Sequence, residues 1–287
     1  MNKILFPFEP QNPIYREAYI YAVKFARNLD AELILLNTFA IDDYYDDITS
    51  NIYKQKIKQK WLQAYEEVIL LNEYYLHNHA RFESDLRIKF DHRFIHGTLV
   101  NEVKQILKNE EIDLLVLPVS DKEEENKRML SIISDEIFEQ NNTSLLITPF
   151  NKPFEVINNI VFATDLKKLN HSKLYLSDIK KYANIFDAKI HFLHISKSKS
   201  VTLPDDIEAY RLIMDFLKKE KEHSFETIYS ENIGDGLKAY LSNNKINLLT
   251  VVKHKHYFLE NLFHKSLSKQ ISLKSKIPTL VMREKKD

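Results

Sequence analysis

The chain has 287 residues, of which 44% are hydrophobic, so it can form one large domain or two domains of ordinary size. Its 41 Lys and Arg balance its 41 Asp and Glu, and a neutral chain without a basic block argues against a dedicated nucleic-acid-binding protein. Cysteine is absent, which excludes disulfides, thiolate metal sites and cysteine nucleophiles.

The first half alternates apolar runs with segments of helical periodicity. The chain opens MNKILFPFEP, without an extended apolar signal region, and no apolar run approaches membrane-spanning length, so we expect a cytoplasmic protein without a membrane partner. Strands are predicted at 3–8, 32–39, 87–95, 113–119 and 144–149, and helices at about 12–29, 49–82 and 98–109. A fourth helix is expected before the last of these strands.

The second half repeats this order of elements. Strands are predicted at 159–164, 189–196, 224–233, 247–252 and 278–283, and helices at about 170–186, 204–223 and 235–244. In the match between the halves, Glu9 corresponds to Asp165, each acid ending an apolar run, and Gly97 is paired with Gly234. The sequence therefore predicts a tandem repeat.

Strands that alternate with helices predict parallel sheets covered on both faces. We expect an α/β fold with two tandem doubly wound five-stranded domains, the first at 1–150 and the second at 151–287. The join falls in FNKPFEV, near 150–156.

The repeat resembles the universal stress protein family. The resemblance rests on the acid that ends strand one, the glycine after strand three and the serine after strand four. In the second half, VVKHKHYFLENLFHKSLSKQISLKSKIPTLVM (251–282) follows a family stretch closely. The resemblance covers nearly the whole chain and implies the family's adenine nucleotide alpha hydrolase-like fold. It also implies an internal pseudo-dimer, in which the last strands, 144–148 and 279–282, pair.

Some members of the family bind ATP, with the phosphates on a glycine-rich loop and the strand-one acid beside the sugar and base. By resemblance, that acid is Asp165 in the second half and Glu9 in the first, and Ser266 takes the place of the family's loop hydroxyl. In the first half, Ser131 or Ser134 aligns only loosely with Ser266. The segment 118–136 also lacks glycine and is acidic at 121–125, which would repel a polyanion.

The glycines of that loop are replaced in the second half by Lys255, Phe258 and Lys265. Glycine allows positive φ and close approach of a ligand to the backbone, whereas Phe258 adds a bulky side chain there. Lys255 and Lys265, with Ser266 and Asp165, would nevertheless leave a residual anion or nucleotide site. Much of 258–271 has helical spacing, so we interpret it as an altered phosphate junction.

Other candidate sites have simpler interpretations. His254, His256 and His264 lie close in sequence, but without a further ligand at suitable spacing we expect solvated histidines and no metal. His191 and His194, three apart in a strand, fall on opposite faces and should not share a metal. The strand-one acids could form a catalytic pair, but a structural acid at the strand end is the preferred interpretation.

The long helix 49–82 carries an aromatic and aliphatic stripe that we interpret as facing the core, with its length leaving some aromatic surface for an interface. The stripe comprises Trp61, Tyr65, Val68, Ile69, Tyr74 and Tyr75.

These observations predict a stress-response protein in the cytoplasm that has no catalytic activity and no cofactor. It would act as a binding or scaffold module for a protein partner or a small ligand that the sequence does not identify. No G-x-S-x-G elbow, P-loop or dinucleotide fingerprint occurs. The alternative is a nucleotide-binding regulator or weak ATPase that uses ATP, with or without Mg²⁺, or AMP in the second domain only. A third option is a sensor of an unfamiliar small ligand.

Overall fold

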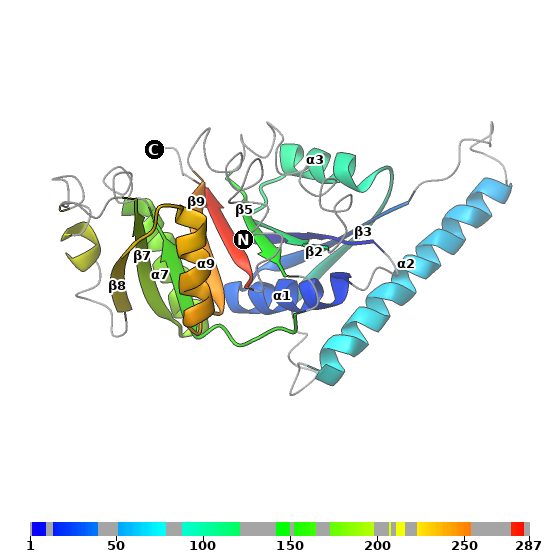
Figure 1. The fold of residues 1–287 in the computed structure, drawn as a ribbon. Coiled ribbons are helices and arrows are strands. Elements are labelled where there is room, and N and C mark those ends of the chain that lie inside the picture. Colours follow the sequence, from blue (N-terminus) through cyan, green and yellow to red (C-terminus); the bar gives the residue numbers. More distant parts are fainter. Residues whose placement is uncertain are drawn as a thin grey trace. The chain divides into compact units, whose positions relative to one another are not determined.

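The computed structural model forms two α/β units (Figure 1). Unit 1 comprises Met1–Thr143 with Phe150–Phe154, and unit 2 comprises Ser144–Pro149 with Glu155–Asp287. The domain boundary at residue 150 stays a prediction. The residues that the structure describes are 2–9, 14–39, 51–78, 88–120, 142–149, 152–164, 173–197, 207, 211–215, 223–253 and 277–283.

Unit 1 contains a parallel sheet with the strand order β3-β2-β1-β4. Its strands are β1 (Lys3–Pro7), β2 (Glu32–Phe39), β3 (Lys89–His96) and β4 (Leu114–Pro118). Its helices are α1 (Ile14–Leu29), α2 (Asn51–Asn78) and α3 (Leu99–Asn109).

The core of unit 1 forms because β1, β2 and β4 are nearly continuous apolar runs, as strands buried on both faces require. Ile4, Leu5 and Phe6 of β1 are fully buried. Burial of each such side chain contributes about 1.5–3 kcal/mol. Phe6 also contacts Tyr15 and Tyr19 of α1, with ring centroids 6.1 and 6.0 Å away, so aromatic packing holds α1 against β1.

Unit 2 repeats this arrangement with the strand order β8-β7-β6-β9-β10-β5. Its strands are β5 (Ser144–Thr148), β6 (Asn159–Ala163), β7 (Lys189–Ser196), β8 (His223–Tyr229), β9 (Leu248–Lys253) and β10 (Thr279–Arg283). Its helices include α7 (Lys173–Phe186) and α9 (Ile233–Asn243). The pairs among β6 to β10 are parallel, as predicted.

The last strand of the first half, β5, pairs with β10 in an antiparallel manner. Leu146 lies opposite Leu280, and Leu145 lies opposite Val281. The predicted pairing of segments 144–148 and 279–282 is therefore confirmed, and through this pairing β5 belongs to unit 2.

The two third helices start at equivalent N-caps. Thr98 Oγ1 accepts a hydrogen bond from the Asn101 N–H at 3.4 Å, and Asn232 Oδ1 accepts one from the Gly234 N–H at 2.9 Å. Gly97 thus lies before its cap, whereas Gly234 lies inside α9, and the predicted pairing of Gly97 with Gly234 is wrong. The helix expected from 235 begins at Ile233 because the Asn232 side chain satisfies the first free N–H groups.

The stripe predicted to face the core along α2 is only partly buried. Trp61, Tyr65 and Ile69 are 46%, 47% and 39% exposed, so the core-facing interpretation is wrong for these three. The helix docks onto α1 through another face, where Tyr19 Oη donates to Asn72 Oδ1 and Tyr75 is fully buried. Among the described residues, no helix combines the length and apolarity needed to cross a bilayer.

Candidate binding site at the carboxyl edges of the sheets

The topology of each unit indicates where a ligand would bind. In open parallel sheets, ligands bind beyond the carboxyl ends of the strands, at the point where the strand order reverses. In unit 1 the chain reverses direction along the sheet between β1 and β4, and in unit 2 it does so between β6 and β9. The point in unit 1 lies next to Glu9, the predicted acid of the first half, which follows β1.

Glu9 follows the last residue of β1 by two positions and is half-buried. The residue before it, Phe8, is buried, and its N–H donates to the Leu36 carbonyl of β2 at 2.9 Å. The hydrogen bonding of β1 to β2 therefore continues up to the neighbour of Glu9. The backbone that carries this carboxylate is held at the carboxyl edge, where the sequence placed it.

A buried amide fixes the carbonyl of Phe8. Asn37 of β2 has no exposed surface, and its Nδ2 donates to the Phe8 carbonyl at 3.4 Å. Its Oδ1 lies 3.0 Å from Nε2 of His92 on β3. Because Asn37 uses its amide nitrogen as the donor, its oxygen accepts, and His92 Nε2 must carry a proton.

Burial also sets the charge state of His92. Desolvation lowers the pKa of its imidazole below the ordinary value, although the negative charge of Asp91 acts in the opposite direction. The neutral Nε2–H form, which donates to Asn37, is therefore the form that predominates at neutral pH. Asn37 and His92 were not among the predicted site residues, although Asn37 stands out as the polar residue in the apolar run LILLN.

Unit 2 has the same contact with a different side chain. The Thr164 N–H donates to the Leu193 carbonyl at 3.0 Å, and the Thr164 carbonyl lies 3.1 Å from Nδ1 of His194 on β7. A carbonyl only accepts, so His194 Nδ1 carries a proton. Thr164 directly precedes Asp165, as Phe8 precedes Glu9.

The whole predicted site of the second half lies outside the described residues. This applies to Asp165, Lys255, Lys265 and Ser266, and also to Phe258. Their assignment to a nucleotide or anion site stays a prediction.

One polar group near the reversal point of unit 2 was not among the predicted site residues. Thr250 of β9 is fully buried, and its hydroxyl has no hydrogen-bond partner in the part of the chain that the structure describes. Its Cα lies opposite Phe162 of β6, on the strand that leads to Asp165. The sequence signal is weak, because threonine is common in strands.

The other histidine predictions have separate outcomes. His254, His256 and His264 lie outside the described residues, and the described residues contain no cluster of three His, Asp or Glu side chains that could hold a metal ion. His191 binds Ser224 Oγ through Nδ1 at 2.8 Å, whereas His194 binds a backbone carbonyl. The two histidines share no partner in these contacts.

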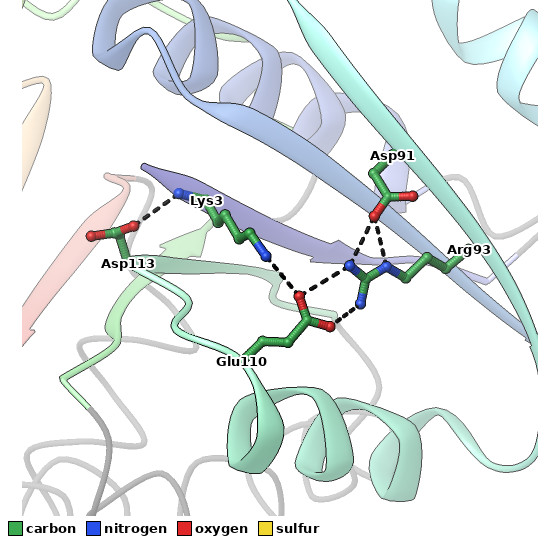
Figure 2. Close-up of polar contacts among 5 residues, drawn as sticks. All are labelled: Lys3, Asp91, Arg93, Glu110 and Asp113. Carbon is green, nitrogen blue, oxygen red and sulfur yellow. Dashed lines mark hydrogen bonds and ion pairs between the residues drawn. The ribbon is translucent and has the colours of Figure 1, made fainter. Parts of the chain in front are cut away.

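A charged cluster occupies the opposite, amino-terminal edge of unit 1 (Figure 2). Glu110, at the end of α3, binds Lys3 Nζ at 2.8 Å and forms two contacts with Arg93, which also binds Asp91 at 2.8 Å. Asp113 Oδ2 accepts from the Lys3 backbone N–H at 2.8 Å. The hydrogen bonds from Arg93, and then those from Lys3, lower the pKa of Glu110 to about 2. These contacts connect β1, β3 and α3, and the cluster lies away from the carboxyl edge of the sheet.

Solved structures share this architecture along the whole chain. A universal stress protein from Archaeoglobus fulgidus DSM 4304 has a TM-score of 0.69 and 14% identity, covering 99% of this chain and 96% of that chain. The chain has the universal stress protein fold. A putative universal stress protein from Pseudomonas aeruginosa UCBPP-PA14 has a TM-score of 0.55 and 11% identity, covering 99% and 93%.

The same fold occurs in a different context. The cytoplasmic domain of a prokaryotic cation chloride cotransporter has a TM-score of 0.55 and 10% identity, covering 98% of this chain and 94% of that chain. No protein-family profile matches the sequence, and no curated protein matches it either. The universal stress protein fold is thus recognised through its geometry, at low sequence identity.

Proposed function

We propose that this chain is a non-catalytic, cytoplasmic stress-response protein that acts as a binding or scaffold module for a protein or a small ligand. The observation that carries this proposal is the position of its glycines. The chain has three, Gly97, Gly234 and Gly236, and all lie at the starts of α3 and α9. Segments 121–141 and 254–276, which follow β4 and β9, contain none.

The local geometry shows how two of these glycines are used. Gly97 has φ +154°, and a Cβ atom there would lie 2.5 Å from Glu102 Oε1. A Cβ atom on Gly236 would lie 2.7 Å from the Cβ of Ser230. Both glycines therefore allow a helix start to pack closely. A phosphate loop needs glycines after β4 or β9, where its backbone N–H groups would surround the phosphates.

The retained acids support a binding role at the same edge. The backbone before Glu9 is fixed by Leu36 and Asn37, and the backbone before Asp165 is fixed by Leu193 and His194. The backbone at the carboxyl edge is held in place, but the segments that follow β4 and β9 lack the glycines that bind phosphates. This combination favours a ligand other than a nucleoside triphosphate. We also propose that the pairing of β5 with β10 makes the chain an internal pseudo-dimer.

Isothermal titration calorimetry with ATP and AMP, with and without Mg²⁺, tests this proposal. We expect no heat of binding at high protein concentration. Turnover of ATP by the purified protein, abolished by Asp165→Ala, would overturn it. Native mass spectrometry of the protein as purified would reveal a bound small ligand without assuming its identity.

The second candidate function is a nucleotide-binding regulator or weak ATPase that uses unit 2 alone. It is favoured by the two cations, Lys255 and Lys265, that replace glycines near Ser266, whereas the first half is acidic at 121–125. Under this alternative, the wild-type protein binds ATP, and Lys265→Glu lowers its affinity for ATP. Under the main proposal, the double substitution Phe258→Gly with Lys265→Gly would be needed before ATP binds.

A further inference from the structure

Helix α2 presents two different apolar faces. Ala64, Leu71 and Tyr75 are buried against the rest of unit 1. At 100° per residue, a second stripe lies roughly 100° around the helix from them. It is formed by Trp61, Leu62, Tyr65 and Ile69, each between 39% and 47% exposed. We call these four residues the α2 stripe.

The α2 stripe contains a stacked aromatic pair. The rings of Trp61 and Tyr65 stack, with their centroids 5.6 Å apart and an angle of 6° between their planes. The helix that carries them is held by Asn72 and Tyr74, which bind Tyr19 and Glu17 of α1. Figure 1 shows α2 running out past the end of α1. A stacked aromatic pair on a fixed helix loses little conformational freedom on binding, which favours association.

The charges along this face have opposite signs at its two ends. Lys54 and Lys58 are exposed and continue the stripe toward the start of the helix. Glu73 is exposed and lies beyond the stripe, toward the end of the helix. A second α2 lying antiparallel, with the twofold axis near Tyr65, would place each Lys58 near the partner's Glu73 region and each Trp61 near Ile69. A parallel pair would instead place like charges together.

We propose that the α2 stripe is the contact surface between two copies of this chain, which pair through antiparallel α2 helices around a twofold axis at Tyr65. The contact is isologous, because one surface supplies both halves and each ion pair forms twice. The rise of about 1.5 Å per residue makes the contact from Lys58 to Glu73 about 22 Å long. A single helix pair buries less than the roughly 1,600 Å² of a standard interface, so the dimer depends on protein concentration.

Site-specific cross-linking tests the position of the twofold axis. The chain has no cysteine, so Tyr65→Cys in the full-length protein introduces the only thiol. We expect oxidation to produce a covalent dimer. The matched control is Leu70→Cys, which is similarly exposed, at 56%, but lies about 140° around the helix from Tyr65. Equal cross-linking of the two variants would indicate random collision and overturn the proposal.

A charge exchange tests the antiparallel register. Lys58→Glu and Glu73→Lys should each weaken dimerisation about tenfold, because the twofold axis repeats every contact. The double variant should restore dimerisation, because it reverses both members of each ion pair. Analytical ultracentrifugation measures the dimer constant, and circular dichroism verifies that every variant is folded. If the double variant dimerised more weakly than both single variants, the proposed antiparallel register would be wrong.

The only tryptophan of the chain, Trp61, provides an independent readout of the wild type. Its emission should shift to shorter wavelength as protein concentration rises, since dimerisation buries the ring. A monomer at every accessible concentration overturns the proposal. So does a monomer whose Trp61 emission shifts only when vesicles of anionic phospholipid are added, because the stripe would then be a membrane-binding face.

Discussion

Asn37 and His194 hold equivalent positions in the two units and bind the equivalent backbone atom. Asn37 donates to the carbonyl of Phe8, and His194 donates to the carbonyl of Thr164. Each carbonyl belongs to the residue directly before a strand-one acid, Glu9 or Asp165. An amide and an imidazole therefore perform the same positioning role at the carboxyl edges of the two sheets.

The opposite edges of the sheets show a similar correspondence. Asp113 Oδ2 accepts from the N–H of Lys3 at 2.8 Å, and Asn247 Oδ1 accepts from the N–H of Asn159 at 3.1 Å. In both units this side chain stands just before the fourth strand and binds the first residue of strand one. These shared contacts support the predicted tandem repeat.

Asn37→Ala should destabilise unit 1 by about 2–3 kcal/mol, because it leaves the Phe8 carbonyl and the His92 Nε2–H without partners in a buried region. Urea unfolding followed by Trp61 fluorescence, which reports on unit 1, measures the change. The control is Asn101→Ala, an exposed position on α3 that should change stability by less than about 0.5 kcal/mol. Equal effects at the two positions would show that Asn37 does not hold the edge.

His194→Asn should be tolerated better than His194→Leu, by about 1–2 kcal/mol, because asparagine can still donate to the Thr164 carbonyl and leucine cannot. Leucine is close to histidine in volume and asparagine is smaller, so packing alone would favour the leucine variant. Amide hydrogen exchange in β6 and β7 localises the change to unit 2. The same protection loss in both variants would contradict a hydrogen-bonding role.

The sequence allows part of this site to be predicted, for physical reasons. The place of Glu9 follows from the apolar run before it, because a strand buried on both faces must end where a charge begins. The hydrogen bonds from His92 to Asn37 and from Asn37 to Phe8 connect neighbouring strands. Which side chains meet there depends on the register of those strands, which the sequence does not give. For α2, periodicity defines a stripe at Trp61 and Tyr65 but does not decide which face meets the core.

Glu110→Gln should reduce the loss of stability in acid. The pKa of Glu110 is lowered to about 2 in the folded protein, below its value in the unfolded chain. Ionised Glu110 therefore contributes stability above pH 4.5, and this contribution is lost as the pH falls from about 4.5 toward 2. Urea midpoints measured across this range should fall less steeply in the variant. Glu111→Gln, at the exposed neighbouring position, is the control and should retain the wild-type slope.

Gly236→Ala should destabilise unit 2 although alanine favours helices. The substitution gains up to about 1 kcal/mol of helix propensity. The new Cβ would lie 2.7 Å from the Cβ of Ser230 and 3.1 Å from Cγ2 of Ile195, so the helix start must move. Such overpacking typically costs about 1–3 kcal/mol, so the steric effect should exceed the gain.

A double-mutant cycle with Ser230→Gly identifies the cause of the Gly236→Ala effect. Ser230→Gly alone should be mildly destabilising, because it removes the 2.6 Å hydrogen bond from Ser230 Oγ to the Asn232 carbonyl. In its presence, Gly236→Ala should cost less, because the nearest atom is gone while Ile195 remains. Unfolding free energies from chemical denaturation give the coupling between the sites. Strict additivity would show that the contact with Ser230 does not limit the packing of α9.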